Sequence, residues 1–192
     1  MFSIWAVIAI AVSILVVGLL VYAAGRPGQF AVARSIVICA SPEKIFPLMN
    51  DPRAALAWNP FIKADPDIKL AFAGPASGVG ARNAWDGNMK VGKGSVEITE
   101  SIAPERIVLR LDMIKPMKGQ NRVEYALVQH GEGTRVTWSM TGAQPFMGKL
   151  MSVFIDCDKM CGDQFEMGLA DLKGIVEGAV APVANAPAMA AP

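Results

Sequence analysis

The chain has 192 residues and a net charge of +1; 53% of its residues are hydrophobic, and its mean hydropathy is +0.36. This near balance of charge gives no electrostatic reason to propose a nucleic-acid partner, which usually needs a strongly basic face, so none is expected. The hydropathy is too high for an ordinary soluble domain and is unevenly distributed, since every charged side chain lies between Arg26 and Glu177. We therefore divide the chain into an apolar leader over 1–25, one domain over 26–178 and an Ala/Pro-rich tail over 179–192, expected to be disordered.

The leader contains an apolar run, Ile4–Ala24, interrupted only by Ser13 and Gly18. In a helix rising about 1.5 Å per residue, the run would span roughly 31 Å and match a hydrocarbon core of about 30 Å. Trp5 and Tyr22 lie near its ends, where aromatic side chains favour the membrane–water interface. A cleaved signal peptide and a buried helix are the alternatives. An amino end without Lys or Arg, the length of the run and its all-round apolar character favour a transmembrane helix that contacts the lipid bilayer through residues 4–24.

Basic residues indicate the side of the membrane. Arg26 and Arg34 follow the apolar run, and no basic residue precedes it, so the positive-inside rule places the domain in the cytoplasm. Cys39, Cys157 and Cys161 are odd in number, which is typical of reduced thiols rather than of a secreted disulfide framework. We expect a single-pass protein of the cell membrane with a cytoplasmic domain.

The domain begins with a predicted strand over 29–39, rich in β-branched residues. Ser41-Pro42-Glu43 predicts a helix start, and Asn50-Asp51-Pro52 begins a second short helix that Pro60 is expected to end. From there the hydrophobic period changes to two, and apolar and polar residues alternate as in an antiparallel sheet with one buried face and one wet face. Six further strands are predicted, over 67–73, 79–86, 91–102, 105–115, 120–129 and 133–142.

After Pro145 the apolar residues recur at intervals of three and four, from Met147 to Ile175. This spacing predicts one helix of roughly 30 residues, ending at Gly178. Gly162 and Gly168 lie within it, and each weakens a helix by up to about 1 kcal/mol relative to alanine, which allows a bend.

Four local sequences accompany this order of elements. They are Ala40-Ser41-Pro42-Glu43-Lys44-Ile45-Phe46, Trp58-Asn59-Pro60-Phe61, Gly133-Thr134-Arg135-Val136-Thr137-Trp138, and Asp158-Lys159-Met160 with Gly162, Phe165-Glu166 and Gly168-Leu169. Together they resemble the START-like or SRPBCC superfamily, which includes the polyketide cyclase/dehydrase and lipid-transport group, and the last is similar to its membrane-tethered members. The resemblance covers about 29–178. It implies an α+β helix-grip fold, a curved antiparallel sheet wrapped around a long C-terminal helix, with a deep apolar cavity between them and no universal catalytic residues.

The expected cavity is in the range of about 300–1,000 Å³ typical of ligand sites. Asp112 and Arg122 are predicted polar groups at its mouth, and several methionines suit apolar ligands of varied shape. The alternative is that each lining residue is a plain core residue. The predicted lining residues share an apolar position on a strand or on the final helix: Trp85, Leu109, Leu111, Tyr125, Leu127, Trp138, Met140, Phe154, Met160 and Met167.

No catalytic constellation stands out. His130, the single histidine, lies in a predicted hairpin turn, so no metal site is expected. Cys157 and Cys161 share a helix face and are expected to be buried structural thiols. No cofactor is expected, because the glycine-containing loops lack the lysine–hydroxyl ending of a phosphate loop.

Three functions stay open. The leading one is a membrane-anchored binding or transport protein for a small hydrophobic ligand, such as a lipid, an isoprenoid or a polyketide-like molecule. The second is a cyclase/dehydrase-type enzyme that uses the same cavity, and the third is a co-chaperone-like interaction module. The sequence names no protein partner.

Overall fold

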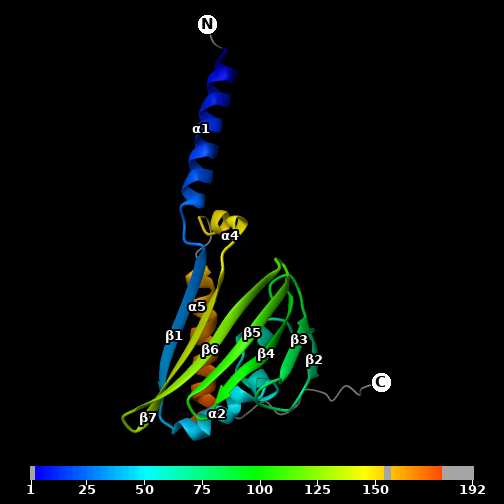
Figure 1. The fold of residues 1–192 in the computed structure, drawn as a ribbon, viewed down its shortest axis with the longest axis vertical. Helices are drawn as coiled ribbons and strands as arrows, with labels where there is room; N and C mark the ends of the chain where they lie inside the picture. Colours follow the sequence, from blue (N-terminus) through cyan, green and yellow to red (C-terminus); the bar gives the residue numbers. More distant parts are fainter. Residues whose placement is uncertain (1–2, 154–156, 179–192) are drawn as a thin grey trace.

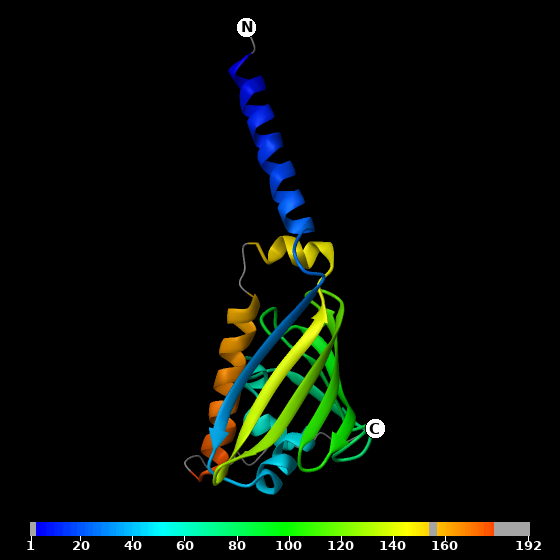
Figure 2. The same cartoon turned by 60° about the vertical axis from the view of Figure 1, so that its left-hand side comes forward.

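The computed structural model describes residues 3–153 and 157–178, except for the side chains of residues 6, 7 and 157. The predicted tail over 179–192 and the predicted lining residue Phe154 lie outside the described residues. Helix α1 (Ile4–Ala24) comes first, and the hydroxyl of Ser3 accepts a hydrogen bond from the N–H of Trp5 at its start. In both views α1 projects away from the rest of the chain (Figures 1 and 2). Across the described part of the chain, no helix meets the combined length and hydropathy of a membrane crossing.

Within the described residues, seven strands form one antiparallel sheet in the order β1-β7-β6-β5-β4-β3-β2. All predicted strands are present, and their ends differ from the predicted ones by at most three residues. The sheet curves around α5 and the short helices, as the helix-grip arrangement requires (Figure 2). The strands are β1 (Gln29–Ile38), β2 (Lys69–Ala73), β3 (Arg82–Asp86), β4 (Lys93–Ile102), β5 (Arg106–Lys115), β6 (Gly119–His130) and β7 (Gly133–Ala143).

Strand register separates an inner face, which packs on the helices, from an outer face. Trp138 on β7 pairs with Tyr125 on β6, which in turn pairs with Ile107 on β5, and all three are buried on the inner face. The intervening residues point outward, where Arg110 and Arg122 form ion pairs with neighbouring carboxylates. The predicted division into one apolar face and one wet face is confirmed.

Three short helices follow β1: α2 (Pro42–Asn50), the 3₁₀ helix η1 (Ala54–Ala57) and α3 (Pro60–Lys63). Helix α2 begins after Ser41 with Pro42 in its first turn, as predicted. The expectation that Pro60 ends a helix is wrong, because Pro60 begins α3. The side chain of Asn59 accepts the N–H of Phe61 at 3.0 Å, and proline suits a first turn, where its missing N–H has no intrahelical partner to lose.

The prediction of one long C-terminal helix is also wrong. Helix α4 (Phe146–Met151) ends at Ser152, whose N–H donates to the carbonyl of Gly148, and α5 (Cys157–Val176) begins separately. The apolar spacing continues through the break because both helices are amphipathic, but they use different surfaces: α4 packs against α1, and α5 packs mainly against β1. Periodicity alone does not distinguish the two arrangements.

Candidate functional site at the sheet–helix interface

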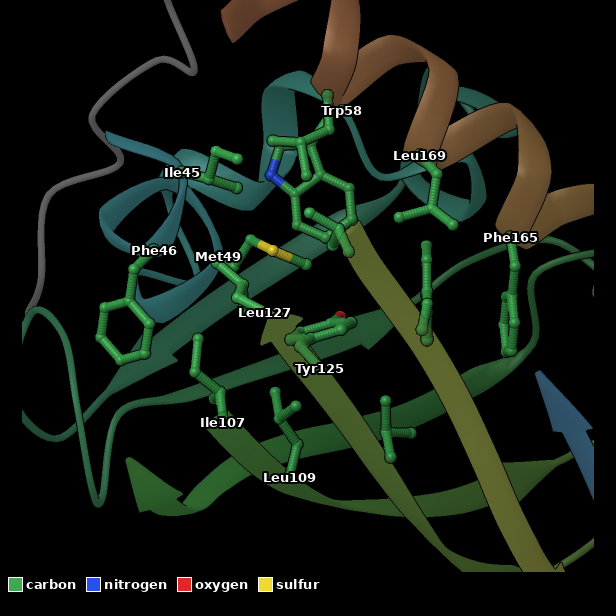
Figure 3. Close-up of a cluster of buried hydrophobic side chains, with 14 of the residues drawn as sticks. Ile45, Phe46, Met49, Trp58, Ile107, Leu109, Tyr125, Leu127, Phe165 and Leu169 are labelled. Carbon is green, nitrogen blue, oxygen red and sulfur yellow. The ribbon is translucent and has the colours of Figure 1, made fainter. Parts of the chain in front are cut away.

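Aromatic side chains fill the centre of the sheet–helix interface. The indole of Trp138 is 3% exposed and stacks on the ring of Phe165 from α5, with ring centroids 4.3 Å apart and planes 9° apart. Trp58 and Tyr125 contact Trp138 edge to face at centroid distances of 5.6 and 5.5 Å. Figure 3 shows Trp58, Tyr125 and Phe165 within the same cluster of buried side chains. Edge-to-face and stacked pairs of this kind stabilise a core beyond the effect of their buried area.

The interface is closed at the end where α2 and η1 lie. Trp58, with no exposed surface, donates its indole N–H to the carbonyl of Leu48 at 3.1 Å, and Ile45 and Met49 of α2 are buried beside it (Figure 3). On the sheet, Leu127 and Val136 complete this packing. Apolar side chains therefore already fill this half of the interface.

The other end of the inner face, toward α4, is less covered. Five apolar residues there face inward according to the strand register but are only half-buried, whereas the residues of the closed end are buried. We call this group of five residues the open end: Phe30, Trp85, Val96, Leu111 and Met113. Apolar surface of this kind, lining a concave sheet, is the ordinary setting of a small-molecule site.

Two glycines leave room for aromatic rings at the open end. A Cβ at Gly94 would lie 2.7 Å from the ring of Trp85, so the indole occupies the space that a side chain on this residue of β4 would take. A Cβ at Gly142 would lie 2.7 Å from the ring of Phe30 and would overlap the side-chain oxygen of Asn121. The rings of Trp85 and Phe30 thus cover the backbone where the strands carry no side chain.

Two buried polar atoms of the inner face have no hydrogen-bond partner among the described residues: Nε1 of Trp138 and Oδ1 of Asn83. A buried polar atom without a partner costs about 1–3 kcal/mol, so such atoms mark sites where a water molecule or a ligand group is accommodated. Burial raises the pKa of Tyr125, which keeps its hydroxyl neutral at physiological pH. The inner face around Tyr125 is therefore apolar and has few polar atoms, and the tyrosine itself is uncharged.

The predicted lining residues fall into four groups. Leu109, Tyr125, Leu127, Trp138 and Met140 are buried on the inner face. Trp85 and Leu111 are half-buried at the open end. Met160 and Met167 on α5 are 57% and 55% exposed, and Phe154 lies outside the described residues. Their role in binding a ligand stays a prediction.

The predicted polar residues at the cavity mouth lie on the outer face. Asp112 accepts hydrogen bonds from Gln120 at 2.8 Å and from Arg110 at 3.1 Å, and these contacts lower its pKa. Arg122 pairs with Glu124 at 2.8 Å. Arg110, Gln120 and Arg122 also line a depression of about 440 Å³ on this outer surface. The structure does not bring Asp112 and Arg122 to the inner face, and the alternation on β5 already places Asp112 opposite Leu111.

Sequence reasoning missed several residues of the interface. Met113 follows the same alternation as Leu111, so the pattern of β5 was sufficient to find it. Phe30 and Val96 lack such a signal, because their half-exposed state depends on where the helices end. The thiol of Cys161 is half-buried rather than buried, and Cys39 is exposed.

The seven-stranded curved sheet, the C-terminal helix and the apolar inner face define a helix-grip protein. The chain belongs to the family described as polyketide cyclase / dehydrase and lipid transport, which matches residues 29–177. This family indicates a fold that binds hydrophobic ligands, in agreement with the inner face described above. No curated protein matches the chain.

Solved structures share the fold at low sequence identity. Protein CV1439 from Chromobacterium violaceum is 18% identical with a TM-score of 0.55, and the alignment covers 79% of this chain and 99% of that one. Protein MLL2253 from Mesorhizobium loti is 14% identical with a TM-score of 0.58, covering 79% and 99%. The Aha1 dimer from Colwellia psychrerythraea is 19% identical with a TM-score of 0.55, covering 77% and 96%.

Proposed function

We propose that this protein binds or carries a small hydrophobic ligand at the open end of the inner face. The observation that carries the proposal is the contrast in burial along one face of one sheet. Leu109 and Tyr125 are buried deep in the interface, whereas Leu111 and Met113, further along β5, are half-buried. Apolar surface left accessible on a concave sheet gains free energy when an apolar molecule covers it.

The polar atoms of the face narrow the ligand class. Nε1 of Trp138 is a donor that lies deeper than the open end, and Oδ1 of Asn83 is an acceptor at the level of Val96, the open-end residue with which Asn83 pairs. A ligand that is apolar over most of its length and carries one hydroxyl or carbonyl group would satisfy one of these two atoms. A lipid, an isoprenoid or a polyketide-like molecule has this chemistry.

A cyclase/dehydrase-type enzyme using the same site is the alternative, and it would need a proton acceptor beside the ligand. The titratable groups Tyr125 and Arg34 lie on the inner face of the sheet by register, and both keep their protons at neutral pH. Burial raises the pKa of Tyr125, and a hydrogen bond to Asp158 raises the pKa of Arg34. The apolar lining therefore favours binding over catalysis. A co-chaperone-like interaction module would not require an accessible apolar inner face.

We also propose that α1 anchors the protein in a membrane, with the domain on the cytoplasmic side. Its support is the uncharged sequence of residues 1–25 and the exposure of apolar side chains around the helix, among them Leu15 at 74% and Val21 at 67%. Exposed apolar surface on this scale is unfavourable in water and favourable in lipid. The cytoplasmic side rests on Arg26 and Arg34, which follow α1.

The ligand proposal is tested on the full-length protein, extracted in mild detergent and released from micelles for native mass spectrometry. We expect a bound apolar molecule that organic extraction recovers and identifies. Two neighbouring residues of β5 provide matched variants: Met113 faces inward, and Ile114 faces outward with 47% exposure. Met113→Glu should abolish the bound mass, because the carboxylate would be buried against apolar ligand, whereas Ile114→Glu should retain it.

Wild-type protein that carries no bound molecule, with the two variants behaving alike toward added fluorescent fatty acid, would overturn the proposal. Loss of the bound mass in Ile114→Glu as well would show that the molecule is held elsewhere and would contradict the assignment to the inner face.

A further inference from the structure

Helix α4 lies crosswise at the domain end of α1, between that helix and the sheet (Figures 1 and 2). Arg26 donates to the carbonyl and hydroxyl oxygens of Ser152 at 2.7 and 3.0 Å, and Nζ of Lys149 lies 3.4 Å from the carbonyl oxygen of Ala24. Ala23 has no exposed surface, although most described side chains of α1 are exposed. The end of α4 is thus fixed to the end of α1.

One side of α4 is apolar and uncovered. Phe146, Met147 and Met151 are 48%, 57% and 40% exposed. At about 100° per residue these three positions fall on one side of the helix, together with the half-buried Leu150, and Lys149 falls on the other. A helix with an apolar side and a basic opposite side is suited to the boundary between lipid headgroups and acyl chains.

We propose that α4 docks on the surface of the lipid bilayer that α1 enters, with Phe146, Met147 and Met151 in the headgroup–acyl boundary. This inference rests on the proposed anchor, because α1 brings α4 to the level at which the chain leaves the bilayer. Tyr22, 59% exposed at the same end of α1 with the Arg26 guanidinium 5.5 Å from its ring centroid, provides the aromatic and basic groups typical of that level.

The docking also orients the ligand site. The N–H of Gln144, just before α4, donates to the carbonyl of Gly28, just before β1, at 2.8 Å. Phe30 of the open end follows two residues later. The open end therefore lies next to α4, and docking of α4 turns it toward the bilayer. A hydrophobic ligand would pass between membrane and protein over a short path, without full exposure to water.

The test uses the full-length protein in nanodiscs of phosphatidylcholine with phosphatidylglycerol. The photocrosslinking amino acid p-benzoylphenylalanine replaces one exposed residue at a time: Met147 in α4, Leu15 in α1 as the anchor control, or Val128 near the far end of β6, 61% exposed, as the solvent control. After illumination, mass spectrometry identifies lipid adducts. We expect adducts at positions 147 and 15 and none at position 128.

Each other outcome is decisive. An adduct at position 15 without one at 147 would overturn the docking of α4 and leave the anchor intact. A crosslink from position 147 to a second copy or to another protein, in place of lipid, would assign the apolar side of α4 to that partner. Absence of lipid adducts at both 15 and 147 would overturn the anchor and the docking together. Adducts at all three positions would indicate nonspecific adhesion and would also overturn it.

Discussion

Gly168 of α5 lies directly against the indole of Trp138 on β7. A Cβ on Gly168 would be 2.8 Å from Cζ3 of Trp138 and 2.9 Å from Cδ of Pro60, so the absence of a side chain allows the helix to approach the sheet this closely. From the sequence alone, Gly168 is expected to weaken a helix. In the structure it sets the distance between the two layers of the fold.

We expect Gly168→Ala to destabilise the protein. The helix gains up to about 1 kcal/mol from alanine, but overpacking against rigid aromatic and proline rings costs about 1–3 kcal/mol. Gly18→Ala in α1 is the control, since a Cβ there would meet no other side chain or backbone segment within 4 Å. Urea unfolding of the full-length protein in detergent measures both. Equal effects of the two substitutions would show that Gly168 has no special packing role.

Trp138 should behave as a core residue. Trp138→Ala removes the ring that stacks on Phe165 and should cost about 3–5 kcal/mol of unfolding free energy. Trp138→Phe keeps a stacked ring and removes the unpaired Nε1 donor, so its cost should be clearly smaller. Urea unfolding of the two variants measures both costs. Equal losses of unfolding free energy in Trp138→Ala and Trp138→Phe would show that the stacked ring contributes nothing.

Stability toward acid should depend on Asp158. Its carboxylate accepts hydrogen bonds from Arg34 at 3.0 and 3.3 Å, which lowers its pKa in the folded protein. A carboxyl group with a lowered folded pKa contributes stability above its unfolded pKa of about 3.9, and that contribution is lost as the pH falls through the folded value. Asp158→Asn should therefore be less stable than wild type at neutral pH, and the difference should shrink as the pH falls below the unfolded pKa of about 3.9.

Asp163 on the same helix is exposed and forms no ion pair among the described residues, so Asp163→Asn should change the stability at neutral pH much less than Asp158→Asn does. Thermal unfolding followed by circular dichroism from neutral to acid pH measures the three proteins. A constant difference between Asp158→Asn and wild type over the whole range would contradict the role of the carboxylate charge.

If α1 is an anchor, the full-length protein should sediment with membranes and resist carbonate washing, because its apolar side chains lie in lipid. The purified protein should retain the leader, residues 1–25, at its amino terminus. Recovery of a mature chain beginning near Ala24, released by the wash, would indicate a cleaved signal peptide instead.

The side of the membrane is tested by reporters fused after Glu177. A cytoplasm-dependent reporter should be active and a periplasm-dependent one inactive, as the positions of Arg26 and Arg34 predict. The reversed pattern would place the domain outside and would require another explanation of the two arginines.

The strands and their two faces could be predicted from the sequence, because the side chains of a strand alternate between faces and the hydrophobic pattern records that alternation residue by residue. Val136, Trp138 and Met140 are on the inner face for this reason, and Asp112 is on the outer one. The start of α2 at Ser41-Pro42 is equally local, since it depends on a cap and a proline in adjacent positions.

Contacts between distant segments determine the two features that the sequence did not predict, the break between α4 and α5 and the open end of the inner face. The break between α4 and α5 arises because one amphipathic segment meets α1 and the next meets β1, and the apolar spacing is the same on both sides of it. The open end exists because α2 and η1 fill one half of the inner face and not the other, which no residue of β5 records: Leu109 and Leu111 have the same side chain and the same face. Their different exposure depends on what packs above them, and packing is a property of the assembled fold.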